Sequence, residues 1–214
     1  MGRAPAEAPA LNESATDREF RRTVGLVALL NLSYFGVEFL VAFAIGSVSL
    51  VADSVDFLED TSINLLIVLA LGWSASWRAR TGMALSGILL IPALSALWMA
   101  WNKLATPVPP GSVALSLTGA GAFAVNLSCA LLLARHRHRA GSLVTAAWLS
   151  ARNDVIANLA IVAAGFLTAW TRSIWPDFAV GLGIAAINAD AARAVWRAAA
   201  QERPTTGEKI ESLS

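Results

Sequence analysis

Four carboxylates lie within an otherwise apolar segment, residues 48–73, and their chemistry constrains this chain more than any other feature. The acids are Asp53, Asp56, Glu59 and Asp60. A helix that crosses a bilayer needs about 20 mostly apolar residues, and each carboxylate near its centre costs roughly 2.5 to 3.5 kcal/mol on insertion scales. Acids that faced lipid would therefore oppose insertion, so these side chains must face protein, water or a cation.

The spacing of the acids places three of them on one side of a helix, and Glu59 points away from that side. Asp56 and Asp60 are four residues apart and share a face, and Asp53 lies within about 60° of that face at 100° per residue. Counted from Val48 at 1.5 Å per residue, Asp56 and Asp60 lie about 12 to 18 Å deep. This depth is close to the middle of a hydrocarbon core that is about 30 Å thick.

A second apolar segment, residues 143–170, carries Asp154 at a similar depth, about 18 Å from the opposite surface. Ser150 precedes Asp154 by four residues and Asn158 follows it by four, so all three point the same way. Two helices that bring carboxylates to one level are typical of a cation pathway, and oxygen ligands suit a divalent ion. Because like charges in a poorly solvated pocket resist joint ionisation, we expect metal and protons to compete for these oxygens.

The composition of the whole chain indicates a membrane protein. Of its 214 residues, 56% are hydrophobic and 14% are charged. Six apolar runs are each long enough to cross a bilayer, and they must do so as helices. The runs span roughly 23–45, 48–73, 81–101, 113–134, 143–170 and 175–196. The predicted fold class is all-α, a polytopic membrane protein with six transmembrane helices.

Lysine and arginine predict the orientation of these helices. They are frequent at the amino terminus, after the second and fourth runs, and after the sixth, whereas the other side has only Lys103 and Arg172. Positive residues favour the cytosolic side, so both termini are expected in the cytosol. We expect a flexible cytosolic tail at 1–20, a six-helix transmembrane transport domain at 21–200 and a short cytosolic tail at 201–214.

The stretch from Gly46 to Asp60 resembles the second span of the cation diffusion facilitator family. That family carries Asp/His-x-x-x-Asp there, which Asp56 and Asp60 match, and Glu38 in the first span also fits its pattern. The resemblance covers roughly residues 20–200. The family's usual cytosolic carboxyl-terminal domain is expected to be missing, which would make this chain a short member.

The fifth span of that family carries His/Asp-x-x-x-Asp, followed four residues later by Asn. Asp154 and Asn158 match this pattern, whereas Ser150 stands where a metal ligand is expected. Imidazole favours zinc, and carboxylate and carbonyl oxygens suit harder ions. The departure at Ser150 therefore leaves the choice of metal open.

The resemblance implies a secondary transporter that exports a divalent metal cation from the cytosol by proton antiport. Zn²⁺ is the family's usual cargo, and the oxygen-rich site leaves Mn²⁺, Fe²⁺, Co²⁺ and Cd²⁺ as further candidates. The expected metal ligands are Asp56, Asp60, Asp154 and Ser150. Residues expected to support these ligands or to carry protons are Asp53, Asn153 and Asn158.

The remaining expectations concern partners and location. We expect no enzymatic activity, no cofactor besides the transported ion, and no nucleic-acid partner. The expected partners are the metal ion, protons, the lipid bilayer and a second copy of the chain, joined through membrane helices. The expected location is a bacterial inner (plasma) membrane.

Three alternatives stay open at this level. The acids could serve only as ion-pair partners of Arg152, which lies in the same segment as Asp154. An intramembrane aspartyl protease would also place an Asp on each of two helices, but its Gly-x-Gly-Asp element is absent beside both Asp56 and Asp154. The third alternative is a non-transporting membrane subunit or metal sensor whose site has degenerated at Ser150.

Overall fold

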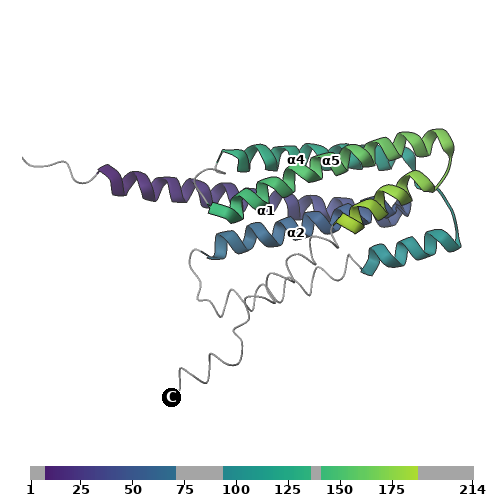
Figure 1. Ribbon diagram of the computed structural model, residues 1–214, viewed down its shortest axis with the longest axis horizontal. Helices are drawn as coiled ribbons and strands as arrows, with labels where there is room; N and C mark the ends of the chain where they lie inside the picture. The colour runs from purple at the N-terminus through teal and green to yellow at the C-terminus, as the bar shows by residue number, and fades with distance from the viewer. Residues whose placement is uncertain (1–7, 71–93, 136–140, 188–214) are drawn as a thin grey trace, which may run out of the picture.

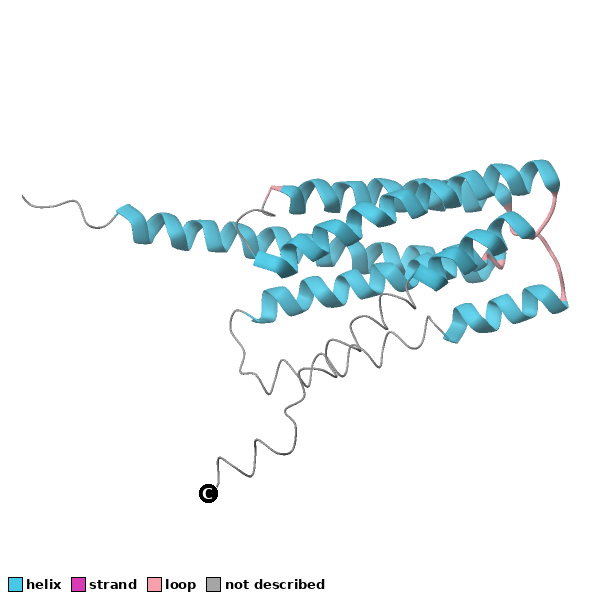
Figure 2. Ribbon diagram, viewed as in Figure 1, coloured by secondary structure: helices cyan, strands magenta, loops and turns pink. Residues whose placement is uncertain are grey.

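The structure is a computed structural model, and it describes residues 8–70, 94–135 and 141–187. Within these ranges every regular element is a helix. The elements are α1 (Ala8–Ile45), α2 (Val48–Ala70), a helix at 94–105, α4 (Ser112–Ala134), α5 (Gly141–Thr171) and a helix Trp175–Ile187. The helices lie alongside one another in an elongated bundle (Figures 1 and 2). The predicted all-α class is confirmed.

Among the described residues, the helix boundaries follow the apolar runs closely, except that α1 begins earlier than its run and the helix at 94–105 ends four residues later than its run. The turn between α1 and α2 consists of Gly46 and Ser47 alone, and Gly46 has a φ of 65°, a conformation that a residue without Cβ adopts at little cost. At its other end α1 begins at Ala8 and so extends into the segment expected to be a flexible tail. Alanine, glutamate and arginine in this segment are strong helix formers. Residues 1–7 and 201–214 lie outside the described ranges.

The four long helices pack in a closed cycle. α1 packs on α2, α2 on α5, α5 on α4, and α4 returns to α1. α2 and α5 are therefore direct neighbours even though α4 and other elements separate them in the sequence. This adjacency brings the two acidic segments of the chain together.

The distribution of polar side chains is that of a membrane protein. Large apolar side chains cover the outside, with Leu40 72% and Trp170 83% exposed, while Glu38, Asp53 and Asn158 are fully buried. Three of the described helices, those containing 18–45, 112–134 and 147–171, are long and apolar enough to cross a bilayer. Apolar groups outside and hydrogen-bonding groups between helices are the arrangement that lipid favours.

Two buried apolar clusters lie at the two ends of the bundle, with a polar layer between them. The first cluster lies near the α1–α2 turn and includes Leu50, Leu115 and Ile161. The second lies toward the opposite end and includes Val27 and Ile67. The acids of α2 fall between these clusters along the helix, so apolar side chains pack on both sides of the polar layer.

Candidate functional site

Three pairs of polar side chains lie between α2 and α5, and we call them the α2–α5 ladder; two pairs are hydrogen-bonded and the third consists of two neighbouring carboxyl groups. They are Asp53 with Asn158, Asp56 with Asp154, and Asp60 with Ser150. The residue numbers rise on one helix as they fall on the other, as they must between antiparallel neighbours. The ladder extends over two turns of α2, about 10 Å at 1.5 Å per residue.

The first pair of the ladder is completely buried. The side-chain nitrogen of Asn158 donates to both carboxylate oxygens of Asp53, at 2.9 and 2.8 Å. The oxygen of Asn158 accepts from Asn126 on α4 at 3.2 Å. Asn158 is therefore oriented by α4 and holds Asp53 as a hydrogen-bonded carboxylate.

The other two pairs contain the predicted metal ligands. Ser150 donates its hydroxyl to Asp60 at 3.0 Å, and the carboxylate of Asp154 interacts electrostatically with those of Asp56 and Asp60. Asp60 is 3% exposed, and Asp56, Asp154 and Ser150 are half-buried. The structure thus places all four predicted ligands along one helix interface.

The predicted ligands do not surround a single point at which a metal ion could bind. Among the described residues, no group of three His, Cys, Asp or Glu side chains is arranged to hold a metal ion as it stands. The acids instead occupy successive levels of the ladder, and Ser150 occupies one oxygen of Asp60. The ligand set therefore stays a prediction, although its members are neighbours.

Asn153 and Arg152 lie outside the face of α5 that carries Ser150 and Asp154. Both are exposed, and the guanidinium of Arg152 lies 5.5 Å from the ring centroid of Trp148. At 100° per residue, Arg152 points directly away from the face that Ser150 and Asp154 share, whereas Asn153 lies about 80° to one side of it. Within the described residues, the geometry supports neither a ligand role for Asn153 nor neutralisation of the acids by Arg152.

Glu38 and Asn126 join this network and were not in the predicted ligand set. Glu38, on α1, is fully buried and lies beside Asp53, close enough to interact with its carboxylate. Asn126 reaches the network through Asn158. Polar residues inside predicted spans were visible in the sequence, but only the packing of α1 and α4 shows which of them face the acids.

A second polar cluster holds the end of the bundle at the α1–α2 turn. The buried carboxylate of Asp177 accepts hydrogen bonds from the hydroxyls of Ser47 and Ser49, both at 2.6 Å, and from the backbone N–H groups of Val48 and Ser49, at 2.9 and 3.2 Å. An acid at a helix amino terminus is favourable. Asp177, from the helix Trp175–Ile187, thereby caps α2.

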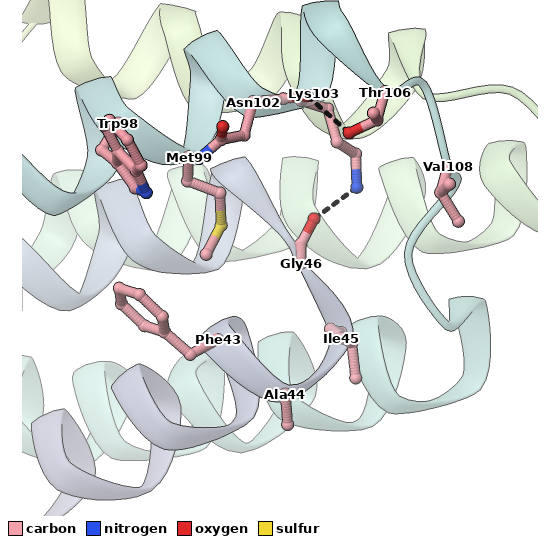
Figure 3. A pocket seen from close by; sticks show the side chains of 10 residues that line it. All are labelled: Phe43, Ala44, Ile45, Gly46, Trp98, Met99, Asn102, Lys103, Thr106 and Val108. Carbon is pink, nitrogen blue, oxygen red and sulfur yellow. Dashed lines mark hydrogen bonds between the residues drawn. The ribbon is translucent and has the colours of Figure 1, made fainter.

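A groove of about 430 Å³ lies beside this cluster and away from the ladder. Figure 3 shows it between the end of α1 and the helix at 94–105, with Phe43 and Trp98 on its wall. Lys103 donates to the backbone oxygen of Gly46 there (Figure 3). Its lining contains no carboxylate, so we do not assign the predicted metal site to this groove.

Comparison with known families agrees with this geometry. Residues 24–202 match the family model described as the cation efflux transmembrane domain, and this range contains the whole ladder. No curated protein matches the chain closely enough to count as a relative. The chain therefore belongs to the cation diffusion facilitator family, as an integral membrane protein of metal cation efflux.

Proposed function

We propose that the chain is a secondary transporter that exports a divalent metal cation from the cytosol in exchange for protons. The observation that carries this proposal is the α2–α5 ladder, in which Asp56, Asp60 and Asp154 lie between transmembrane helices. Carboxylates at this depth are costly unless they serve an ion or proton pathway. Family membership supports cation efflux, and the ladder supplies a place for the ion.

The metal would bind at the level of Asp56, Asp60 and Asp154. Because these carboxylates occupy successive levels, an arriving ion would draw them together and release Ser150 from Asp60 or bind its hydroxyl oxygen. An oxygen-only ligand set suits Mn²⁺, and zinc also accepts carboxylate ligands. We propose that Zn²⁺ and Mn²⁺ both bind, with less discrimination for zinc than a site with imidazole would give.

Proton exchange follows from charge balance in the same layer. When the ion leaves, several carboxylates remain near one another in a poorly solvated interior, and like charges there favour proton uptake. Metal binding requires deprotonated ligands, so each ion that enters releases protons. An inward proton gradient would then drive metal outward.

Alternating access would expose this layer to one side at a time. The two apolar clusters that flank it, one around Leu50 and Leu115 and the other around Val27 and Ile67, are suited to act as the two barriers. Transporters of this general type rearrange helices around a fixed site near the midplane. Opening would separate the helices at one cluster while the other stays packed.

The test is metal uptake into sealed proteoliposomes that contain a pH-sensitive dye. We expect Zn²⁺ or Mn²⁺ entry to coincide with proton movement in the opposite direction. Metal entry without proton movement, at both pH 6 and pH 8, would indicate a uniporter or channel. No uptake of any divalent ion by folded protein would favour the alternative of a non-transporting subunit or sensor.

A further inference from the structure

Glu38 is a buried carboxyl group without a donor. Its side chain is 0% exposed, and neither oxygen accepts a hydrogen bond from any residue that the structure describes. A buried polar group left unpaired costs about 1 to 3 kcal/mol, and more when it is charged. Such a group in the middle of a bundle indicates that something else satisfies it.

The donors around Glu38 are directed elsewhere. Tyr34, one turn away on α1, donates its hydroxyl to the backbone oxygen of Thr118 at 2.6 Å. Asn158 donates to both oxygens of Asp53. Asp53 itself lies within hydrogen-bonding reach of Glu38, but it brings a second carboxylate, so the pair is satisfied only by a shared proton or a cation. The neighbourhood is thus rich in oxygen acceptors and poor in donors.

A second acceptor in the same network is also unmatched. The side-chain oxygen of Asn126 is buried and accepts no hydrogen bond within the described residues, while its nitrogen donates to Asn158. Asn158 links Asn126 to Asp53 by hydrogen bonds. The oxygen of Asn126 lies at one end of this network and the oxygens of Glu38 lie beside the other, and none of them accepts a hydrogen bond within the described residues. Buried oxygens from two carboxylates and an amide are the ligand type that hard divalent cations prefer.

This group lies on a different level from the predicted metal ligands. Asp53 precedes Asp56 by three residues, about 4.5 Å along α2 toward the α1–α2 turn. That turn faces outside in the predicted orientation. An ion that left the Asp56 level outward would therefore meet Glu38 and Asp53 before it reached the apolar cluster around Leu50.

We propose that Glu38 and Asp53 form a second divalent-cation site on the outward side of Asp56, Asp60 and Asp154. The proposal rests on the cation export proposed above. The site takes an ion that is already dehydrated and holds it between the inner ligands and the outer apolar cluster. Its oxygen ligands give it little preference for zinc over manganese.

The experiment counts bound metal in purified full-length protein at pH 7.5, using equilibrium dialysis with Mn²⁺ and separately with Zn²⁺. We expect two ions per chain for the wild type, one for Glu38→Gln, one for Asp154→Asn, and none for the double variant. Glu19→Gln, which changes an exposed acid on the same helix, should leave the count unchanged. Asp53→Asn supplies a second test if Glu38→Gln does not fold.

A count that Glu38→Gln and Asp53→Asn both leave at the wild-type value would overturn the proposal, because the pair would then hold only a proton. A wild-type count of one ion, lost in Glu38→Gln and also in Asp154→Asn, would likewise overturn it by placing Glu38 in a single shared site. The count does not depend on transport. Wild-type protein that binds two ions but moves none would therefore contradict the proposed function and leave the second site supported.

Discussion

Replacement of Asp177 by asparagine should destabilise the bundle, because this carboxylate holds α2 to the helix Trp175–Ile187. Its two oxygens accept four hydrogen bonds from Ser47, Val48 and Ser49, and the residue is fully buried. Asparagine keeps the shape but offers one acceptor oxygen. If its oxygen replaces the carboxylate oxygen that accepts three of these bonds, its amide N–H group faces the fourth donor, the backbone N–H of Val48.

The expected size of the effect follows from these contacts. A hydrogen bond to a charged group contributes about 1.5 to 3 kcal/mol, so the loss of the bond from Val48 costs about this much. The missing charge at the amino terminus of α2 adds up to about 1 kcal/mol. At about 2 to 4 °C per kcal/mol for a chain of this size, the melting temperature should fall by roughly 5 to 15 °C.

The assay uses the only cysteine of the chain. Cys129 is buried, so a thiol-reactive dye added in detergent should report unfolding as this thiol becomes accessible. Ser49→Ala removes one hydroxyl donor and should cause a smaller fall, while exposed Glu19→Gln should cause none. If Asp177→Asn melts within about 2 °C of the wild type, less than about 1 kcal/mol, the carboxylate does not hold α2 and the reasoning is refuted.

Three further predictions concern the ladder and the outer cluster. Ser150→His should raise the ratio of Zn²⁺ to Mn²⁺ uptake in competition, because it adds a nitrogen ligand one turn from Asp154; an unchanged ratio would show that this position does not face the ion. Asp60→Asn should abolish metal-driven proton movement in dye-loaded vesicles, since it removes a titrating group and keeps its shape; wild-type proton movement would exclude this residue from coupling. Lys103 lies beyond the predicted end of the third span. Burial lowers its pKa below the ordinary value of 10.5, and the negative charge of Asp177 opposes this shift. The unfolded chain then binds the proton more tightly, so the free energy of unfolding should rise with pH until about 10.5, and Lys103→Gln should flatten this rise in melts measured from about pH 8.

Residue spacing was sufficient to predict which side chains share a face of α2 and which share a face of α5. Asp56 and Asp60 share a face because helical neighbours recur every three to four residues, and the same rule aligns Ser150, Asp154 and Asn158. The interpretation of Asn153 as a supporting residue required a distorted helix, and the regular helix α5 exposes it instead. Local periodicity thus predicts faces well and fails where a distortion is assumed.

The partner of Glu38 was partly predictable. Because the turn at Gly46 and Ser47 is so short, residues at similar distances from it lie at similar levels of the α1–α2 pair. Glu38 is eight residues before Gly46 and Asp53 is six after Ser47, so their levels differ by about 3 Å. The role of Asp177 was not predictable in the same way. The sequence indicates an acid that suits the start of its own helix, but its contacts with Ser47 and Ser49 depend on how that helix packs against α2.

The central claim, that the acids shared by α2 and α5 carry the transported ion, is tested most directly by metal flux in proteoliposomes with Asp154→Asn and Asn153→Ala. These neighbouring positions point about 100° apart around α5, and Asn153 is exposed whereas Asp154 is half-buried. Both variants should insert and fold because neither adds a charge. We predict that Asp154→Asn reduces Zn²⁺ and Mn²⁺ uptake to the level of protein-free vesicles, whereas Asn153→Ala transports like the wild type. Wild-type uptake by Asp154→Asn would contradict the account.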